Sequence, residues 1–151
     1  MSALGSLPPP GERSIEILVV DDSAVVRQKL KSIIESDPRF RVTLAADPYD
    51  AVAMLRKSVP GAIVLDVEMP RMDGLTFLRK LMRQHPLPVV LCTAQAERAV
   101  TALEMGAIEV ISKPDWNNAS RLPEWSQALL ESIRNAARAG RLPFQIGRAH
   151  V

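Results

Sequence analysis

The chain is poor in cysteine and aromatic residues, and it carries little net charge. Cys92 is the single cysteine among 151 residues, so no internal disulfide can form, which favours the reducing cytoplasm. Aromatic residues make up 4% of the chain, so the core must be built mainly from aliphatic side chains. A net charge of +2 without a basic stripe gives no indication of nucleic-acid binding. No apolar run approaches the roughly 20 residues of a membrane-spanning helix, so we expect no membrane insertion.

Aliphatic residues are plentiful, and their distribution indicates one globular domain. Hydrophobic residues make up 47% and charged residues 24% of the chain, which excludes a wholly disordered protein. Residues 1–14 contain Pro8-Pro9-Pro10 and no apolar core segment, so we predict a flexible leader and not a secretory signal. A single domain is predicted over residues 15–139, followed by the start of a linker at 140–145.

Short aliphatic runs alternate along the chain with segments of helical periodicity. The runs are predicted to be strands over residues 15–20, 40–45, 62–65, 89–92 and 108–111. Helices are predicted over residues 25–34, 48–57, 75–84, 96–105 and 124–139, with Ser23 capping the first and Gly106 ending the fourth. Nearly continuous Val/Ile/Leu runs are typical of strands buried on both faces of a parallel sheet. The sequence therefore predicts an α/β fold, in which right-handed crossovers place helices on both faces of a five-stranded parallel sheet.

Polar residues follow four of the predicted strands, at the point where each strand ends. They are Asp21 and Asp22 after the first strand, Asp66 after the third, Thr93 after the fourth and Lys113 after the fifth. Ligands of open parallel sheets bind outside the carboxyl ends of the strands, so we expect these side chains to form one site. Each of them alone could be a helix cap or a turn residue, but the combination favours a functional site.

The chemistry of this set points to phosphoryl transfer. Carboxylates held close together repel one another, and Mg²⁺, which prefers oxygen ligands, relieves that repulsion. The ammonium of Lys113 and the hydroxyl of Thr93 suit the oxygens of a phosphoryl group. Asp66 ends the central strand, and aspartate is a known covalent acceptor of phosphate. We therefore predict that Asp66 is the nucleophile.

The residues at these strand ends resemble the receiver domains of bacterial response regulators. The matching motifs are Leu18–Ser23, Leu65–Gly74, Thr93-Ala94 and Lys113-Pro114, and the resemblance covers Ile15 to Arg138. It implies a flavodoxin-like fold with strand order 2-1-3-4-5. It also implies phosphorylation of Asp66 by a histidine kinase, with Thr93 and Lys113 moving to contact the phosphate.

The same resemblance implies the metal ligands and one backbone feature. Mg²⁺ would be bound by Asp22, Asp66 and the backbone carbonyl of Glu68, with Asp21 alongside. The Lys113-Pro114 peptide bond would be cis.

A narrower resemblance is to the receiver of the chemotaxis protein-glutamate methylesterases. It is carried by Asp21–Ala24 with Arg27, Leu65–Leu75 with Phe77–Met82, Ala102–Glu104 with Gly106-Ala107, and Asp115–Leu122. In that family the receiver occludes a C-terminal esterase domain until phosphorylation releases it, and the donor is a chemotaxis histidine kinase. The chain departs from the family at Val110, where the usual residue is an aromatic one that changes rotamer on activation.

The esterase domain itself is missing from the sequence. A methylesterase needs a nucleophilic serine, a histidine base and an aspartate, yet the chain has no Gly-rich serine elbow, and its histidines are His85 and His150. We therefore expect no esterase activity from this chain. Residues 146–151 can be translated from a common sequencing-adapter string, ATCGGAAGAGCACACGTC, so we predict that this tail is non-native and that the natural protein continues after about Gln145.

Two other functions are compatible with the sequence. The receiver could serve a different output domain, such as a DNA-binding one, or none, although no helix-turn-helix pattern follows the last helix. The chain could also be a Mg²⁺-dependent phosphohydrolase that uses Asp66 in turnover, with Glu68 as the general acid two residues later.

Overall fold

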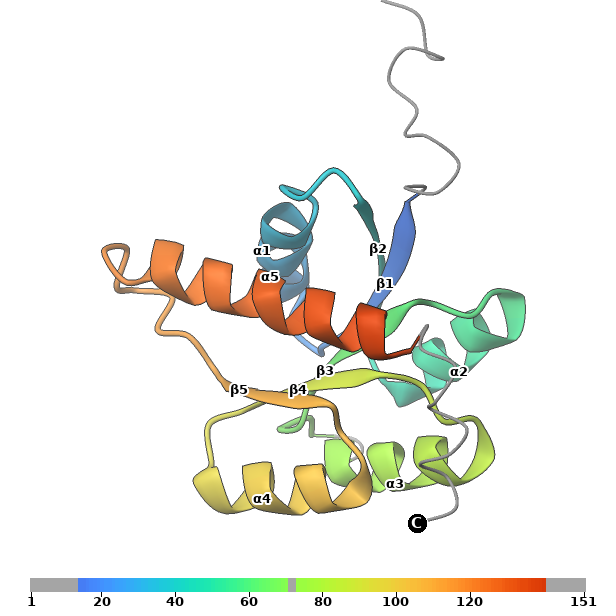
Figure 1. Ribbon diagram of the computed structural model, residues 1–151. Helices are drawn as coiled ribbons and strands as arrows, with labels where there is room; N and C mark the ends of the chain where they lie inside the picture. The colour runs from blue at the N-terminus through green and yellow to red at the C-terminus, as the bar shows by residue number, and fades with distance from the viewer. Residues whose placement is uncertain (1–13, 71–72, 141–151) are drawn as a thin grey trace, which may run out of the picture.

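The computed structural model describes residues 14–70 and 73–140, in which five strands alternate with five helices (Figure 1). The strands are β1 (Ile15–Val20), β2 (Phe40–Ala45), β3 (Ala62–Asp66), β4 (Val89–Thr93) and β5 (Glu109–Ser112). The helices are α1 (Ala24–Ile34), α2 (Pro48–Lys57), α3 (Gly74–Gln84), α4 (Ala96–Met105) and α5 (Leu122–Ala139). Apart from Ser14, the predicted leader lies outside the described residues, as do linker residues 141–145 and the predicted non-native tail at 146–151.

The five strands form one parallel sheet in the order β2-β1-β3-β4-β5. This order confirms the predicted fold, with β3 at the centre of the sheet. The order in which strands are added to the sheet reverses at β1, because β2 lies on one side of it and β3 on the other. Such a reversal opens a crevice at the carboxyl ends of the neighbouring strands, which is where β3 ends in Asp66.

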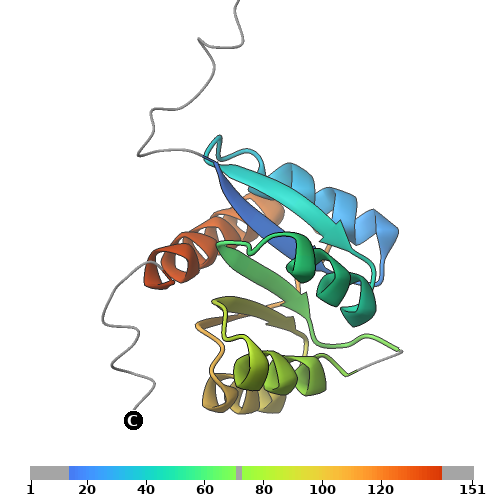
Figure 2. The ribbon, with the colours of Figure 1, turned by 90° about the vertical axis from the view of Figure 1, so that its right-hand side faces the viewer.

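Helices cover both faces of the sheet, as Figures 1 and 2 show, with α1 and α5 on one face and α2, α3 and α4 on the other. Alternate residues of each strand point to opposite faces. Ile17 and Val19 accordingly pack in the cluster under α1 and α5, whereas Leu18 and Val20 pack in the cluster under the other three helices. Both faces of the sheet are thus buried, which explains the nearly continuous aliphatic runs in the sequence.

Local sequence signals account for most element ends. The Ser23 hydroxyl accepts a hydrogen bond from the Val26 amide at 3.2 Å, and Gly106 ends α4 in the left-handed conformation at φ 113°. Two predicted elements differ from the structure by more than one residue at one end, since β5 is shifted at both ends and the start of α5 is shifted by two residues. β5 runs from Glu109 to Ser112, one residue later than predicted, and α5 starts at Leu122, because Pro123 is tolerated in the first turn of a helix.

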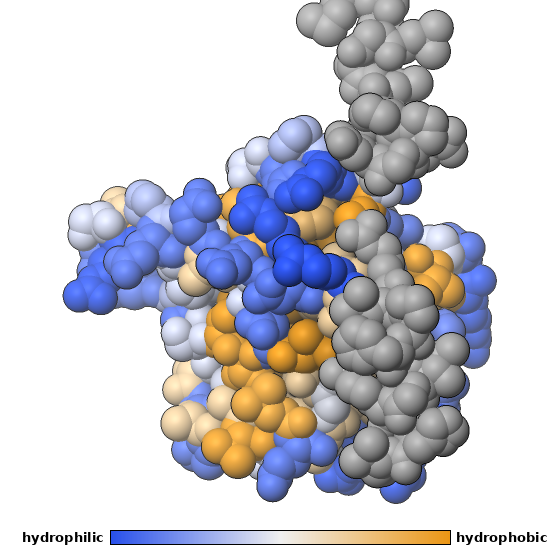
Figure 3. Space-filling model, in the orientation of Figure 1, coloured by the Kyte–Doolittle hydropathy of each residue, from blue (hydrophilic) through white to orange (hydrophobic). Residues whose placement is uncertain are grey.

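The surface is mostly polar, but apolar side chains gather below α5 on the face shown in Figure 3. On α4, Val100 is 60% exposed and Leu103 is 51% exposed, and the half-buried Val110 of β5 packs against the core on the α4 side. Within the described ranges, no helix combines the length and the hydropathy that a bilayer crossing would require.

Candidate functional site

The predicted site residues meet at the carboxyl edge of the sheet. Asp21 and Asp22 follow β1 directly, Asp66 is the last residue of β3, and Thr93 is the last residue of β4. Lys113 follows β5, and its backbone amide donates to the Thr93 carbonyl at 3.2 Å, which keeps the ends of β4 and β5 together. Parallel pairing in register therefore brings together residues that lie up to 92 positions apart in the chain.

Three carboxylates form a compact acidic cluster at this edge. Oxygens of Asp21, Asp22 and Asp66 all lie within 4.8 Å of one another. Asp21 and Asp66 are buried, whereas Asp22 is exposed. Burial, and then the nearby carboxylates, raise the pKa of Asp21 to about 6 despite a hydrogen bond from the Ser23 amide. Burial likewise raises the pKa of Asp66. An oxygen-only donor set of this kind fits a hard divalent cation such as Mg²⁺.

Lys113 supplies the positive charge of the site. Its Nζ lies 2.8 Å from Asp66 Oδ1 and 3.1 Å from Glu68 Oε1. Burial opposes the charged form of Lys113, but the hydrogen bonds and charges of these two carboxylates prevail and raise its pKa. The ammonium is therefore held in its protonated form beside the predicted nucleophile.

The side chain of Glu68 makes contacts in the site that were not predicted from the sequence. Its carboxylate accepts hydrogen bonds from the Thr93 hydroxyl at 2.8 Å and from the Ala94 amide at 3.0 Å, in addition to its contact with Lys113. Partial burial opposes ionisation, but these donors lower the pKa of Glu68. Glu68 was expected to bind the cation through its backbone carbonyl, or to be the general acid in the phosphohydrolase alternative. The contacts of its side chain could not be predicted, because they depend on β4 and β5, which lie far away in the sequence.

An aromatic and aliphatic wall forms one side of the site. A pocket of about 230 Å³ holds the acidic cluster and is also lined by Val26, Leu30, Trp116 and Trp125. The two indole rings meet edge to face with their centroids 5.7 Å apart, and the Trp125 Nε1–H donates to the Ser112 carbonyl at 2.9 Å. This wall was also missed, although the two tryptophans flanking the predicted start of α5 were the available signal.

Two expectations about individual residues have different outcomes. The expectation of a cis Lys113-Pro114 bond is wrong, since the structure has no cis peptide bond among the residues it describes. The trans form, which is the intrinsically favoured one, still brings Lys113 into contact with Asp66. The assignment of Cys92 to a core strand is confirmed, because it is buried in β4 and its pKa is raised by burial, which keeps the thiol protonated.

A family model described as the response regulator receiver domain matches residues 17–122. The chain belongs to this family. The receiver is also similar to solved structures, among them the response regulator domain of Thermotoga maritima CheB. That similarity has 36% identity and a TM-score of 0.73, and it covers 83% of this chain and 98% of that one.

Curated relatives show which response regulators this receiver most resembles among those compared. The receiver is 52% identical over 138 residues to a protein-glutamate methylesterase/protein-glutamine glutaminase of Anaeromyxobacter dehalogenans, and 48% identical over 132 residues to one of Geobacter metallireducens. These matches cover 88% and 84% of this chain but only 38% and 37% of the relatives. The chain is thus a receiver of the CheB type that spans little more than a third of the length of these relatives.

Proposed function

We propose that this receiver accepts a phosphoryl group on Asp66 from a chemotaxis histidine kinase. The observation that carries the proposal is the contact of Asp66 Oδ1 with Lys113 Nζ at 2.8 Å, inside a cluster of three carboxylates. The Asp66 carboxylate attacks the phosphorus of the donor, and the bond between phosphorus and the donor atom breaks. Lys113 then balances negative charge on the oxygens of the bound phosphoryl group.

The acidic cluster is the proposed binding site for Mg²⁺. Asp21, Asp22 and Asp66 would hold the ion together with the backbone carbonyl of Glu68, and it would neutralise charge on the incoming phosphoryl group. Burial raises the pKa of Asp21 to about 6, so protons would compete with the cation for this carboxylate below about that pH.

Incubation with acetyl phosphate and Mg²⁺ tests the phosphoacceptor role. Intact-mass measurement should show one added phosphoryl group, which is lost slowly, and none for Asp66→Asn. Glu104→Gln, which changes an exposed carboxylate on α4, is the matched control and should react like the parent protein. Sustained turnover of varied phosphomonoesters would instead support the phosphohydrolase alternative.

We further propose that the receiver regulates a methylesterase domain that follows it in the natural protein. The match covers only 38% of the first methylesterase relative, which is therefore about 2.6 times as long as the matched region. This similarity supports a methylesterase output over a DNA-binding one. The exposed Val100 and Leu103 of α4 offer apolar surface for contact with such a domain. We also propose that the receiver works in the cytoplasm, because Cys92 is a free and buried thiol and the proposed kinase would act in the same compartment.

Reading the gene past the Gln145 codon tests the proposed output domain. We expect an open frame that continues into an α/β domain with serine, histidine and aspartate partners. A genuine stop codon directly after Gln145 would leave a receiver that acts through its own surface.

A further inference from the structure

A groove lies between α2 and α3, which are seen one above the other in Figure 2. It has a volume of about 310 Å³. No carboxylate of the Asp66 site lines it, so the groove is separate from that site. Its apolar lining comes from both helices, as Pro48, Tyr49, Val52, Leu55, Phe77 and Leu81.

The apolar side chains of this groove differ in how far they reach the surface. Phe77 and Leu81 are buried in the core on this side of the sheet, whereas Tyr49 is 65% exposed and Val52 is 39% exposed. Tyr49 is also the single tyrosine of the chain. Tyrosine combines a large apolar contact area with a polar tip and is enriched where proteins bind one another. The groove therefore offers a recess for an inserted side chain, with exposed apolar surface beside it.

Positive charge flanks the groove on both sides. Arg56 of α2 and Lys80 of α3 line it and are exposed, and no described Asp or Glu lines it. Neither cation forms an ion pair with a carboxylate in the described part of the chain. The two helices together contain five Lys or Arg residues and one acidic residue, Asp50, a net charge of +4, whereas the whole chain has +2. Both cations are thus available to an acidic partner.

We propose that this groove binds an acidic amphipathic helix of a partner protein. Such a helix inserts apolar side chains over Phe77 and Leu81, as amphipathic helices do in apolar grooves. Carboxylates beside its apolar face meet Arg56 on one side and Lys80 on the other. Charge on both sides of a recess favours a helix over a flat anionic bilayer, which would contact the cations without filling the recess. This inference does not depend on phosphorylation of Asp66.

A synthetic peptide tests the proposal on the full chain. The probe has about 18 residues, enough to form a helix, with Leu and Phe on one face and Glu elsewhere. One control peptide has Lys in place of every Glu, and another has the composition of the probe without an apolar face. In NMR titrations, the probe should shift the amide resonances of Tyr49, Val52 and Lys80 with a Kd below about 1 mM, equally in Asp66→Asn. Both control peptides should bind at least about 10-fold more weakly.

Charge reversal separates the groove from the overall charge of the chain. Arg56→Glu with Lys80→Glu should weaken binding of the acidic probe at least about 10-fold and strengthen binding of the Lys peptide. Arg41→Glu with Arg138→Glu is the matched control, because it makes the same change in net charge at exposed positions of β2 and α5. This control should bind the probe like the parent protein.

Truncation of Tyr49 tests the apolar part of the groove. Tyr49→Ala should weaken binding of the probe about 10-fold, whereas Val100→Ala, at an exposed position of α4, should leave it unchanged.

Four outcomes would overturn the proposal. The first is no binding of the acidic probe, and the second is equally tight binding of the Lys peptide. The third is a shift of the Tyr49 and Val52 resonances when the concentration of the protein alone is raised, which would assign the groove to a second copy of the chain. The fourth is a shift of these resonances by phosphatidylglycerol vesicles at concentrations where the probe has no effect, which would assign the groove to a membrane surface.

Discussion

At the scale of single residues, Glu68 binds the groups that a phosphoryl group on Asp66 would need. Its carboxylate receives the Thr93 hydroxyl, the Ala94 amide and the Lys113 ammonium, a set of donors suited to three phosphoryl oxygens. The Glu68 carboxylate thus holds these donors in place. A phosphoryl group on Asp66, as proposed above, would compete with the Glu68 carboxylate for them.

Removal of the Glu68 carboxylate should therefore speed phosphorylation. Because Glu68→Ala frees Thr93 and Lys113 while keeping the backbone carbonyl, we expect acetyl phosphate to react roughly 3- to 10-fold faster, which corresponds to a barrier lower by about 1 kcal/mol. Pseudo-first-order rates from intact-mass time courses measure the effect, with Glu104→Ala as the control. A slower reaction of Glu68→Ala would show that the carboxylate assists the transfer.

Gly74 is the second residue on which the site depends, because α3 starts against the backbone of the Asp66 loop. A Cβ atom there would lie 2.6 Å from the Asp66 carbonyl oxygen and 2.7 Å from Val67 Cα, and backbone atoms cannot yield as a flexible side chain does. We expect Gly74→Ala to lower the free energy of unfolding by about 1–3 kcal/mol. Denaturant titration measures this loss, and Arg79→Ala on the exposed side of α3 should cost far less.

At the scale of elements, Asp37 links the loop between α1 and β2 to α5. Its buried carboxylate accepts bonds from the Arg39 guanidinium at 2.9 Å and from Arg134 Nε of α5 at 3.1 Å. The Arg39 hydrogen bond is the main cause of the lowered pKa of Asp37, with Arg134 contributing, and burial opposes it. The ionised carboxylate therefore stabilises the fold by holding α5 against the start of β2.

This ion pair gives the stability of the domain a defined dependence on pH. A lowered pKa in the folded state means stabilisation that is complete above the ordinary value of 3.8 and is lost as the pH falls below it. We expect Asp37→Asn to cost about 1–3 kcal/mol at pH 7. The difference in Tm between the parent and Asp37→Asn should narrow between pH 5 and pH 2.5, whereas a constant difference would contradict the assignment.

At the scale of the whole molecule, the acidic cluster links cation binding to stability. A ligand that binds only the folded state stabilises it by RT ln(1 + [L]/Kd), or about 1.4 kcal/mol at ten times Kd. For a domain of this size, that corresponds to a rise in Tm of roughly 3–6 °C. Thermal scans over a Mg²⁺ titration should show this rise, and Asp22→Ala should reduce or abolish it. An equal rise in Asp22→Ala would place the cation elsewhere.

The helices and strands could be predicted from the sequence more fully than the side-chain contacts within the site. The bounds of β1, β2, α2 and α4 were predicted to the residue. Strands buried on both faces give continuous aliphatic runs, and helices packed on the sheet give aliphatic residues at helical spacing. The contacts of Glu68 could not be predicted in the same way, since they depend on side-chain directions across three strand ends. The trans form of the Lys113-Pro114 bond was not predicted, because the family resemblance implied a cis bond and the local sequence was not used to test it.

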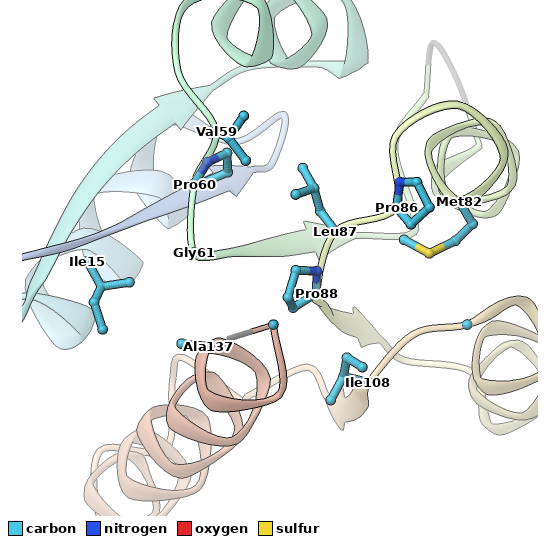
Figure 4. Close-up of a pocket in the computed structure, with 12 residues that line it drawn as sticks. Ile15, Val59, Pro60, Gly61, Met82, Pro86, Leu87, Pro88, Ile108 and Ala137 are labelled. Atoms are coloured by element: carbon cyan, nitrogen blue, oxygen red, sulfur yellow. The ribbon is translucent and has the colours of Figure 1, made fainter. Parts of the chain in front are cut away.

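Helix α5 runs between the two edges of the sheet. Trp125 near its start lines the acidic pocket, and Gly140 after its end lines an apolar pocket at the edge where the strands begin (Figure 4). The fifteen steps from Trp125 to Gly140 span about 22 Å at a rise of about 1.5 Å per residue. A tilt of roughly 5° about the Trp125 end would move Gly140 by about 2 Å, so a small rotation at one edge of the sheet would be measurable as a displacement at the other.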